Sequence, residues 1–275
     1  MKSKRGIIEG ISALLVVVLL LGAAYAYTDN WPPAVIVESK SMQHGNGFTL
    51  GVINTGDIVG VKKINNFSQV ITYVQARTQG KSINYGDYGD VIVYKNNYLG
   101  ELVIHRAIMY IEGWKGNTPI IYYFENQSWI TINGSNVIIR DVGYAHRNLL
   151  IELSQYVGEK GFVTMGDYNL ANSPFIINGN TYLAADQNVG IDNTLVNVSQ
   201  IMGVAVGYIP ILGVLKLWIT GKTTYIPMES NIVMALVLAA IVIYALIPAP
   251  KKDKKDEQKL AREKKSKVNK EEKKS

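Results

Sequence analysis

Residues 7–27 read IIEGISALLVVVLLLGAAYAY, an apolar run with a single charged residue, Glu9. Because about 20 residues of helix cross the hydrocarbon core of a bilayer, this run predicts a transmembrane anchor. It follows the basic sequence MKSKR, which predicts that residues 1–6 are a cytoplasmic N-terminus. The segment Ala24-Tyr25-Ala26 resembles the cleavage site of a secretory leader, so a removable leader is the alternative interpretation.

A second apolar run, residues 231–247, ends before the Lys-rich tail at residues 248–275. It predicts a second transmembrane helix, again with a cytoplasmic basic flank. Because both termini are then cytoplasmic, residues 28–227 are predicted to form an extracytoplasmic domain at the plasma membrane. Four N-x-S sequons in this middle region agree with that location: Asn66, Asn126, Asn133 and Asn197.

A third apolar run, residues 201–219, is long enough to span a membrane but contains Pro210, Lys216 and three glycines. A span here would place the basic tail outside the cytoplasm, against the positive-inside rule. We therefore expect a pair of strands or a membrane-surface segment, with a third span as the alternative.

Composition excludes several classes of function. Of the 28 Lys and Arg residues and the 22 Asp and Glu residues, 12 and 6 lie in residues 251–275, which leaves 16 of each sign elsewhere. The net charge of +6 therefore belongs to the tail, and no nucleic-acid partner is expected. Cysteine is absent, so a cysteine nucleophile, a thiolate zinc site and disulfides are excluded. We expect no cofactor and no metal.

The middle region carries short apolar runs bounded by Gly, Asn and Asp, which predict strands and a mainly β domain. An exception is expected at residues 148–156, where apolar residues fall at helical spacing. Residues 64–85 are predicted to be a surface insertion, and residues 171–184 a second insertion that contains a hairpin with its turn at Gly179. The expected strands are residues 35–37, 58–61, 91–94, 102–104, 120–124, 129–132, 137–139, 161–165 and 201–206.

A candidate nucleophile, Ser41, lies directly after the first expected strand and close to the end of the first anchor. A serine hydroxyl attacks a carbonyl only when a base removes its proton and donors stabilise the oxyanion. Five motifs follow one another along the chain: Ser39-Lys40-Ser41-Met42, Gly56-Asp57-Ile58-Val59, Gly89-Asp90-Val91-Ile92-Val93-Tyr94, Ile104-His105-Arg106 and Gly166-Asp167-Tyr168-Asn169.

In this order the five motifs resemble the conserved boxes of the signal peptidase I family. The resemblance implies a signal-peptidase-like antiparallel β domain flanked by two transmembrane helices. It also implies the branch in which histidine, rather than lysine, is the general base. The sequence differs from the family pattern at Lys40, where a glycine is common, and at Met165, where a lysine is usual.

The resemblance assigns Ser41 as nucleophile and His105 as general base, with the Ser41 N–H and the Ser39 hydroxyl as the oxyanion hole. His146 also precedes an arginine, but it lacks a preceding Gly-Asp strand, so we prefer His105. His44 is expected to be a loop residue near the site. The two Gly-Asp aspartates, Asp57 and Asp90, are expected to serve the turns.

A third group should orient the imidazole. The family usually has an aspartate a few residues after the fifth motif, whereas here the next acidic residue is Asp186, followed by Asp192. We assign Asp186 to this role and keep Asp192 as the rival. Asp167 is expected to have a structural role, or to support the catalytic residues without being one of them.

The implied activity is a membrane-bound serine endopeptidase that removes N-terminal signal peptides from exported preproteins after small residues. The expected partners are these signal peptides, the lipid bilayer and the secretion machinery. An extended substrate should pair with an edge strand, for which the expected positions are Val35, Ile36, Val37 and Glu38. One alternative is a related peptidase of narrower specificity. Another is a non-catalytic, membrane-anchored extracellular β protein of a surface layer or assembly.

Overall fold

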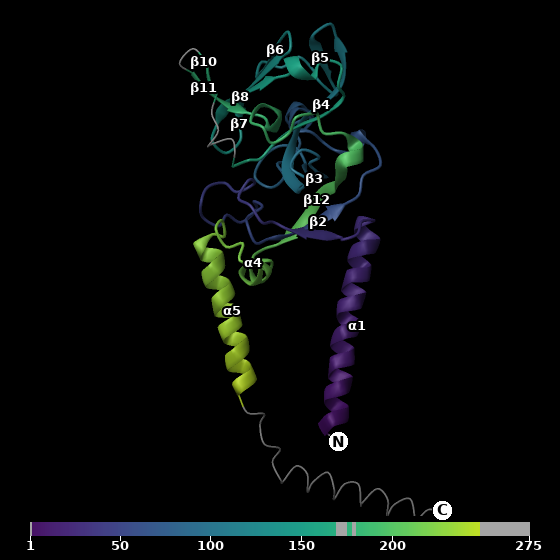
Figure 1. Ribbon diagram of the computed structural model, residues 1–275, viewed down its shortest axis with the longest axis vertical. Helices are drawn as coiled ribbons and strands as arrows, with labels where there is room; N and C mark the ends of the chain where they lie inside the picture. The colour runs from purple at the N-terminus through teal and green to yellow at the C-terminus, as the bar shows by residue number, and fades with distance from the viewer. Residues whose placement is uncertain (1, 169–174, 178–179, 248–275) are drawn as a thin grey trace, which may run out of the picture. The chain divides into compact units, whose positions relative to one another are not determined.

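The structure is a computed structural model that describes residues 2–168, 175–177 and 180–247 (Figure 1). The chain forms two units, Met1–Met234 and Ala235–Ser275, and all the described strands belong to the first. The basic tail at residues 248–275 and the expected turn at Gly179 lie outside the described residues.

Two helices are long and apolar enough to cross a membrane, among the residues that the structure describes. They are α1 (Lys2–Thr28) and α5 (Met228–Leu246), and they contain most of the two expected anchors. Almost none of either apolar segment is buried, whereas a core helix of a soluble protein would be covered. Both helices are therefore compatible with a membrane protein.

The larger sheet has the strand order β1-β2-β12-β3-β4-β5, and β9 also pairs with β4. All of its strand pairs are antiparallel. Its strands are β1 (Ala34–Ile36), β2 (Ile58–Lys62), β3 (Val91–Lys95), β4 (Leu102–Lys115), β5 (Thr118–Ile121), β9 (Gly161–Met165) and β12 (Ile201–Ile209).

The smaller sheet has the order β10-β11-β8-β7-β6 and is antiparallel except for the parallel pair β11–β8. The expected hairpin of the second insertion is present as β10 and β11, which pair with each other. The prediction of a mainly β domain is thus confirmed. The strands are β6 (Ile130–Asn133), β7 (Asn136–Val142), β8 (Arg147–Glu152), β10 (Phe175–Ile177) and β11 (Asn180–Ala184).

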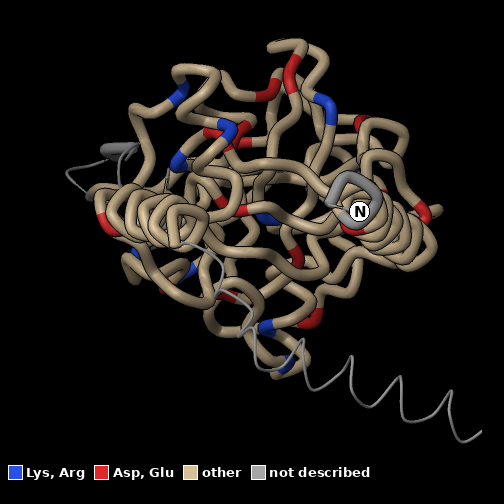
Figure 2. Tube along the Cα trace, turned by 90° about the horizontal axis from the view of Figure 1, so that it is seen from below, with Lys and Arg blue, Asp and Glu red and all other residues tan. Residues whose placement is uncertain are grey.

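The two sheets share one hydrophobic core. Met109 of β4 and Val163 of β9 pack with Ile139 of β7 and Leu149 of β8 in a single buried cluster. Charged residues of both signs are interspersed along the trace of the domain, in keeping with its neutral composition (Figure 2).

The prediction of a helix at residues 148–156 is wrong. This segment forms β8 and then a 3-10 turn, η2 (Ser154–Tyr156). The strand is hydrogen-bonded to β7 and to β11, and Leu149, Leu150 and Ile151 are all buried. A strand covered on both faces has a continuous apolar run, which periodicity cannot distinguish from a buried helix.

The segment at residues 64–85 is more than a surface insertion. It contains the 3-10 turn η1 (Phe67–Gln69) and the helix α2 (Tyr73–Thr78). Tyr73 and Val74 are fully buried in the core that the two sheets share. The insertion therefore contributes to the core.

Residues 201–219 form one strand and one short helix. The first part is β12, which lies between β2 and β3, and the second part is most of α4 (Val214–Thr220). The expected strand at residues 201–206 is thus confirmed, whereas the second strand of the expected pair is a helix. The remaining 3-10 turns are η3 (Asp186–Asn188) and η4 (Val198–Gln200).

The motifs Gly56-Asp57 and Gly89-Asp90 both form turns that begin strands. Both glycines have positive φ, +95° and +81°, a conformation that side chains disfavour. The Asp57 carboxylate accepts a hydrogen bond from the Ile211 N–H at 3.0 Å, and the Asp90 carboxylate accepts one from the Ile71 N–H at 2.8 Å. These aspartates satisfy backbone donors, as expected for turn residues.

We expect Gly89→Ala to lower the free energy of unfolding by about 3 kcal/mol, the sum of a left-handed backbone penalty and overpacking. A Cβ at residue 89 would lie 2.4 Å from the backbone nitrogen of Tyr73. Gly80→Ala is the control, because Gly80 also has positive φ but an added Cβ meets nothing within 4 Å. Gly80→Ala should lower the free energy of unfolding by only about 1 kcal/mol. Denaturant unfolding in detergent measures both, and equal losses would contradict the close approach.

Candidate active site

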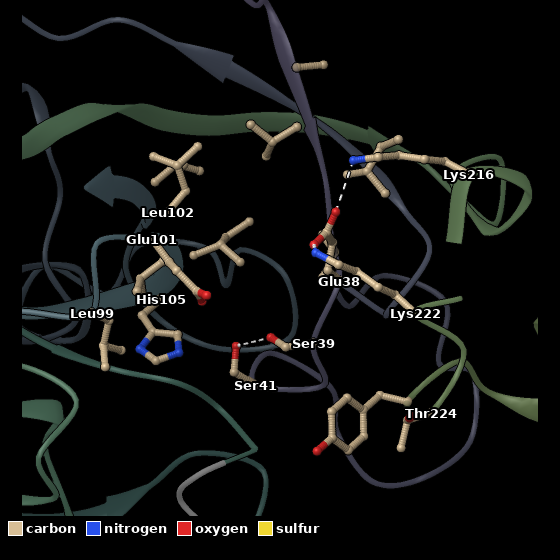
Figure 3. A pocket seen from close by; sticks show the side chains of 18 of the residues that line it. Glu38, Ser39, Ser41, Leu99, Glu101, Leu102, His105, Lys216, Lys222 and Thr224 are labelled. Carbon is tan, nitrogen blue, oxygen red and sulfur yellow. Dashed lines mark hydrogen bonds and ion pairs between the residues drawn. The ribbon is translucent and has the colours of Figure 1, made fainter. Parts of the chain in front are cut away.

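A cleft of about 1080 Å³ lies between the edge strand β1 and the start of β4. Its walls are mainly aliphatic, with Val35 and Val37 on one side and Leu102 and Ile104 on the other. Residues 216–225, from α4 onward, supply Lys216, Gly221, Lys222, Thr224 and Tyr225 to a third wall. Ser39, Ser41 and His105 all line this cleft (Figure 3).

Ser41 lies on a loop just beyond β1 that is fixed at several points. The Thr55 hydroxyl donates a hydrogen bond to the Ser39 carbonyl at 2.8 Å, and Met42 is buried. The Tyr168 N–H donates to the Ser41 carbonyl at 2.8 Å. The fifth motif therefore holds the backbone of the serine itself.

Two donors accompany the Ser41 hydroxyl. The Ser39 hydroxyl donates to Ser41 Oγ at 3.2 Å (Figure 3). Within the described part of the chain, the Ser41 N–H donates to no protein acceptor. The two groups expected to form the oxyanion hole are thus adjacent to the serine oxygen.

His105 is buried on β4, opposite Ile92 of β3, and its ring reaches the cleft. Its Nδ1 lies 2.6 Å from Oδ2 of Asp186, which begins the turn η3 and is 0% exposed. With Nδ1 bonded to a carboxylate, the lone pair for proton transfer is on Nε2. Figure 3 shows the imidazole and the Ser41 hydroxyl facing each other in the cleft.

The described hydrogen bonds do not include one between Ser41 and His105. In enzymes without substrate such bonds are often long, and they tighten when substrate binds. Ser41 and His105 line the same cleft, so the lack of a direct hydrogen bond does not separate them.

Two opposing effects set the pKa of His105. Burial lowers it, because a buried imidazolium loses hydration. The negative charge of Asp186 and the hydrogen bond to it outweigh burial, so the pKa of His105 lies above its usual value. The protonated form of His105 is therefore stabilised relative to an ordinary histidine.

Among the described hydrogen bonds and ion pairs, Asp192, the rival carboxylate, has none with His105. It accepts hydrogen bonds from the Tyr94 hydroxyl and the Asn96 amide, both at 2.5 Å. Burial, followed by the charge of Asp186, raises the pKa of Asp192 to about 6. Its backbone N–H donates to the Asp186 carbonyl at 3.2 Å, so Asp192 supports the turn that carries the imidazole's partner.

Asp167 forms a buried ion pair with Arg106. Its Oδ1 accepts from Arg106 Nε at 2.8 Å and its Oδ2 from an Arg106 terminal nitrogen at 2.6 Å. His44 lies 3.1 Å from the same Oδ2. Burial alone would raise the pKa of Asp167, but Arg106 and His44 outweigh it and lower the pKa.

Arg106 also donates to five backbone carbonyls of the loop that leads into β3. Sequence reasoning gives this residue no role beyond its place after His105. The apolar sequence around Arg106 could have revealed this role, because an arginine in a buried strand requires a carboxylate partner. The carbonyls belong to Asn84, Tyr85, Asp87, Tyr88 and Gly89.

His146 lies away from the cleft, in the turn between β7 and β8, where it pairs with Asp141 at 2.8 Å. Its side chain is 79% exposed.

His44 stacks on Tyr144 with ring centroids 4.5 Å apart. Lys40, between the two serines, donates to the Tyr168 hydroxyl at 2.9 Å. Among the described residues, no group of three His, Asp or Glu side chains could hold a metal.

We expect Arg106→Met to lower the free energy of unfolding by about 3–5 kcal/mol, because it leaves a buried carboxylate without its main partner. Lys216→Met is the control, since Lys216 is 50% exposed and pairs with the partly exposed Glu38. That variant should stay within about 1 kcal/mol of the wild type. Thermal melts followed by near-UV circular dichroism compare the three proteins, and an unchanged melt for Arg106→Met would contradict the buried pair.

The geometry thus joins Ser41, His105 and Asp186 at one cleft and leaves His146 outside it. Asp167 and Asp192 each support the site through other residues. No protein-family model matches the chain, and a search of curated proteins finds no match.

Proposed function

We propose that the protein is a membrane-anchored serine endopeptidase that removes signal peptides from exported preproteins. The observation that carries the proposal is the buried pair of His105 and Asp186, which opens onto the same cleft as Ser41. A histidine oriented by a carboxylate and facing a serine is the arrangement that activates a hydroxyl nucleophile. The ordered motifs that resemble signal peptidase I support the same interpretation.

In the proposed reaction, Ser41 Oγ attacks the carbonyl carbon of the scissile peptide while His105 Nε2 accepts the hydroxyl proton. The tetrahedral intermediate collapses as His105 gives this proton to the leaving amine, and an ester to Ser41 remains. Water then attacks the ester, with His105 again accepting and returning a proton. Asp186 stays ionised and stabilises the imidazolium in both steps.

The Ser41 N–H and the Ser39 hydroxyl serve as the oxyanion donors in this proposal. Both lie beside the attacking oxygen, and Ser39 already donates to it at 3.2 Å. During attack the negative charge moves to the former carbonyl oxygen, and donors that are already positioned stabilise it without reorganisation.

The strand edges beside the cleft suit an extended substrate. The edge of β1 that is not bonded to β2 has no strand partner among the described residues. β4 pairs with β9 only from Arg106 onward, so the stretch Leu102–His105 has one free edge too. A substrate backbone can add to either edge, with its side chains among Val35, Val37 and Ile104.

The proposed orientation follows from the flanking charges. The N-terminal sequence MKSKR and the tail at residues 248–275 are both basic, which favours a cytoplasmic location for each. The catalytic domain then lies outside the plasma membrane, where preproteins emerge from the secretion machinery.

We expect His105→Ala to lower kcat by roughly 10⁴-fold or more, because the nucleophile and base act as a unit. His146→Ala is the matched control, since it removes an exposed imidazole outside the cleft, and it should keep most of the activity.

The second comparison concerns the carboxylate that orients the imidazole. Asp186→Asn should lower kcat by roughly 10⁴-fold, whereas Asp192→Asn should keep most of the activity. Cleavage of a model preprotein in detergent measures all four, beside a thermal melt. Comparable losses in His146→Ala or Asp192→Asn would move the base or its partner elsewhere.

The activity should depend on the protonation of His105. Only the neutral imidazole accepts the Ser41 proton, so kcat/KM should rise as the pH increases through the pKa of His105. Because Asp186 raises this pKa, the midpoint should lie above the usual histidine value of about 6.5. A pH profile of kcat/KM for the wild type measures it. A midpoint at or below that value would mean that Asp186 does not dominate the base.

A further inference from the structure

The short helix α4 is apolar on two faces. Val214 and Leu217 are fully buried against the domain. Leu215 and Ile219, four residues apart and therefore on one side of the helix, are 40% and 79% exposed. Leu212, just before the helix, is 51% exposed. Because a surface helix normally presents polar residues to water, this outer face requires an apolar cover.

α4 is joined to the start of α5 through Trp218, the residue before Ile219. The Trp218 indole N–H donates to the Asn231 side-chain oxygen at 2.7 Å, which ties α4 to the first turn of α5. Tyr225 and Met228, between the two helices and at the first position of α5, are also exposed. The exposed apolar residues therefore lead along the chain into a helix that can span a bilayer.

We propose that the α4 face, defined as Leu212, Leu215, Ile219, Tyr225 and Met228, lies in the interfacial layer of the bilayer that α5 enters. The bilayer is the apolar phase that α5 already requires, so the cover is continuous with the span. Aromatic rings with a polar group, such as Tyr225 and Trp218, favour this layer. Lys216 and Lys222 carry long aliphatic stems that can lie along apolar surface while their ammonium groups stay in water.

This placement has a consequence for the cleft. Lys216, Lys222 and Tyr225 line its third wall, and both lysines are paired with Glu38, which precedes the serine loop. The cleft would therefore open at the membrane surface, where a substrate leaving the bilayer can enter. That consequence rests on the proposed function, whereas the membrane contact of α4 does not.

The absence of cysteine from the chain allows a direct test. Ile219→Cys and, as a second reporter on the same face, Leu215→Cys are each labelled with an environment-sensitive nitrobenzoxadiazole probe. The full-length protein is placed in nanodiscs of phosphatidylcholine and phosphatidylglycerol, with or without brominated acyl chains. Ile120→Cys is the matched control, because Ile120 is 46% exposed on β5, at the end of the domain away from α4 (Figure 1). Val237→Cys, within α5, reports insertion of the span.

We expect brominated lipid to remove most of the fluorescence at residues 219 and 215, as at residue 237, and to leave residue 120 unchanged. Quenching at residue 237 alone would overturn the proposal, and so would equal quenching at residues 219 and 120. An unquenched probe at residue 237 would also overturn it, because α5 would then not enter the bilayer. None of these readouts depends on cleavage, so failure of the peptidase proposal leaves the result intact.

Discussion

The buried ion pair between Arg106 and Asp167 is the interaction on which the rest of the site depends. Arg106 follows His105 on β4, and its guanidinium also binds the carbonyls of the loop that enters β3. Asp167 precedes Tyr168, whose N–H holds the Ser41 carbonyl. One pair of charges thus fixes the strand that carries the histidine relative to the loop that carries the serine. Because both charges are buried, neither can be lost without leaving the other uncompensated.

A second constraint is the position of Asp186 after the β10–β11 hairpin. β11 leads from the hairpin along β8, and the chain then turns at η3, where the Asp186 carboxylate reaches Nδ1 of His105. Asp192 joins Tyr94 and Asn96 to the same turn. The hairpin therefore lies between Asp167 and Asp186 in the chain, and the β11–β8 pair returns the chain to the imidazole.

Local sequence patterns predicted the strands and the turns, because alternating apolar residues and Gly-Asp turns report on a few neighbouring residues. They were misleading at β8, which is covered on both faces, and at Tyr73 and Val74, whose burial depends on residues distant in the chain. The ordered motifs, through their resemblance to signal peptidase I, pointed to Ser41 and His105, and the same resemblance pointed to Asp186, with Asp192 left as the rival. The roles of Arg106, Asn96 and Tyr94 could not be predicted, since their partners are 61 to 98 residues away and meet them only in the folded chain.

The proposed peptidase activity requires that Ser41 attacks a peptide bond. The most direct measurement incubates the detergent-solubilised, full-length protein with a preprotein that has alanine one and three residues before the cut, and determines the product masses. The wild type should give one cleavage after the alanine, and Ser41→Ala should give none while its thermal melt is unchanged. Cleavage by Ser41→Ala at the wild-type rate would exclude Ser41 as the nucleophile, and a wild-type protein that leaves the preprotein intact would exclude the peptidase activity.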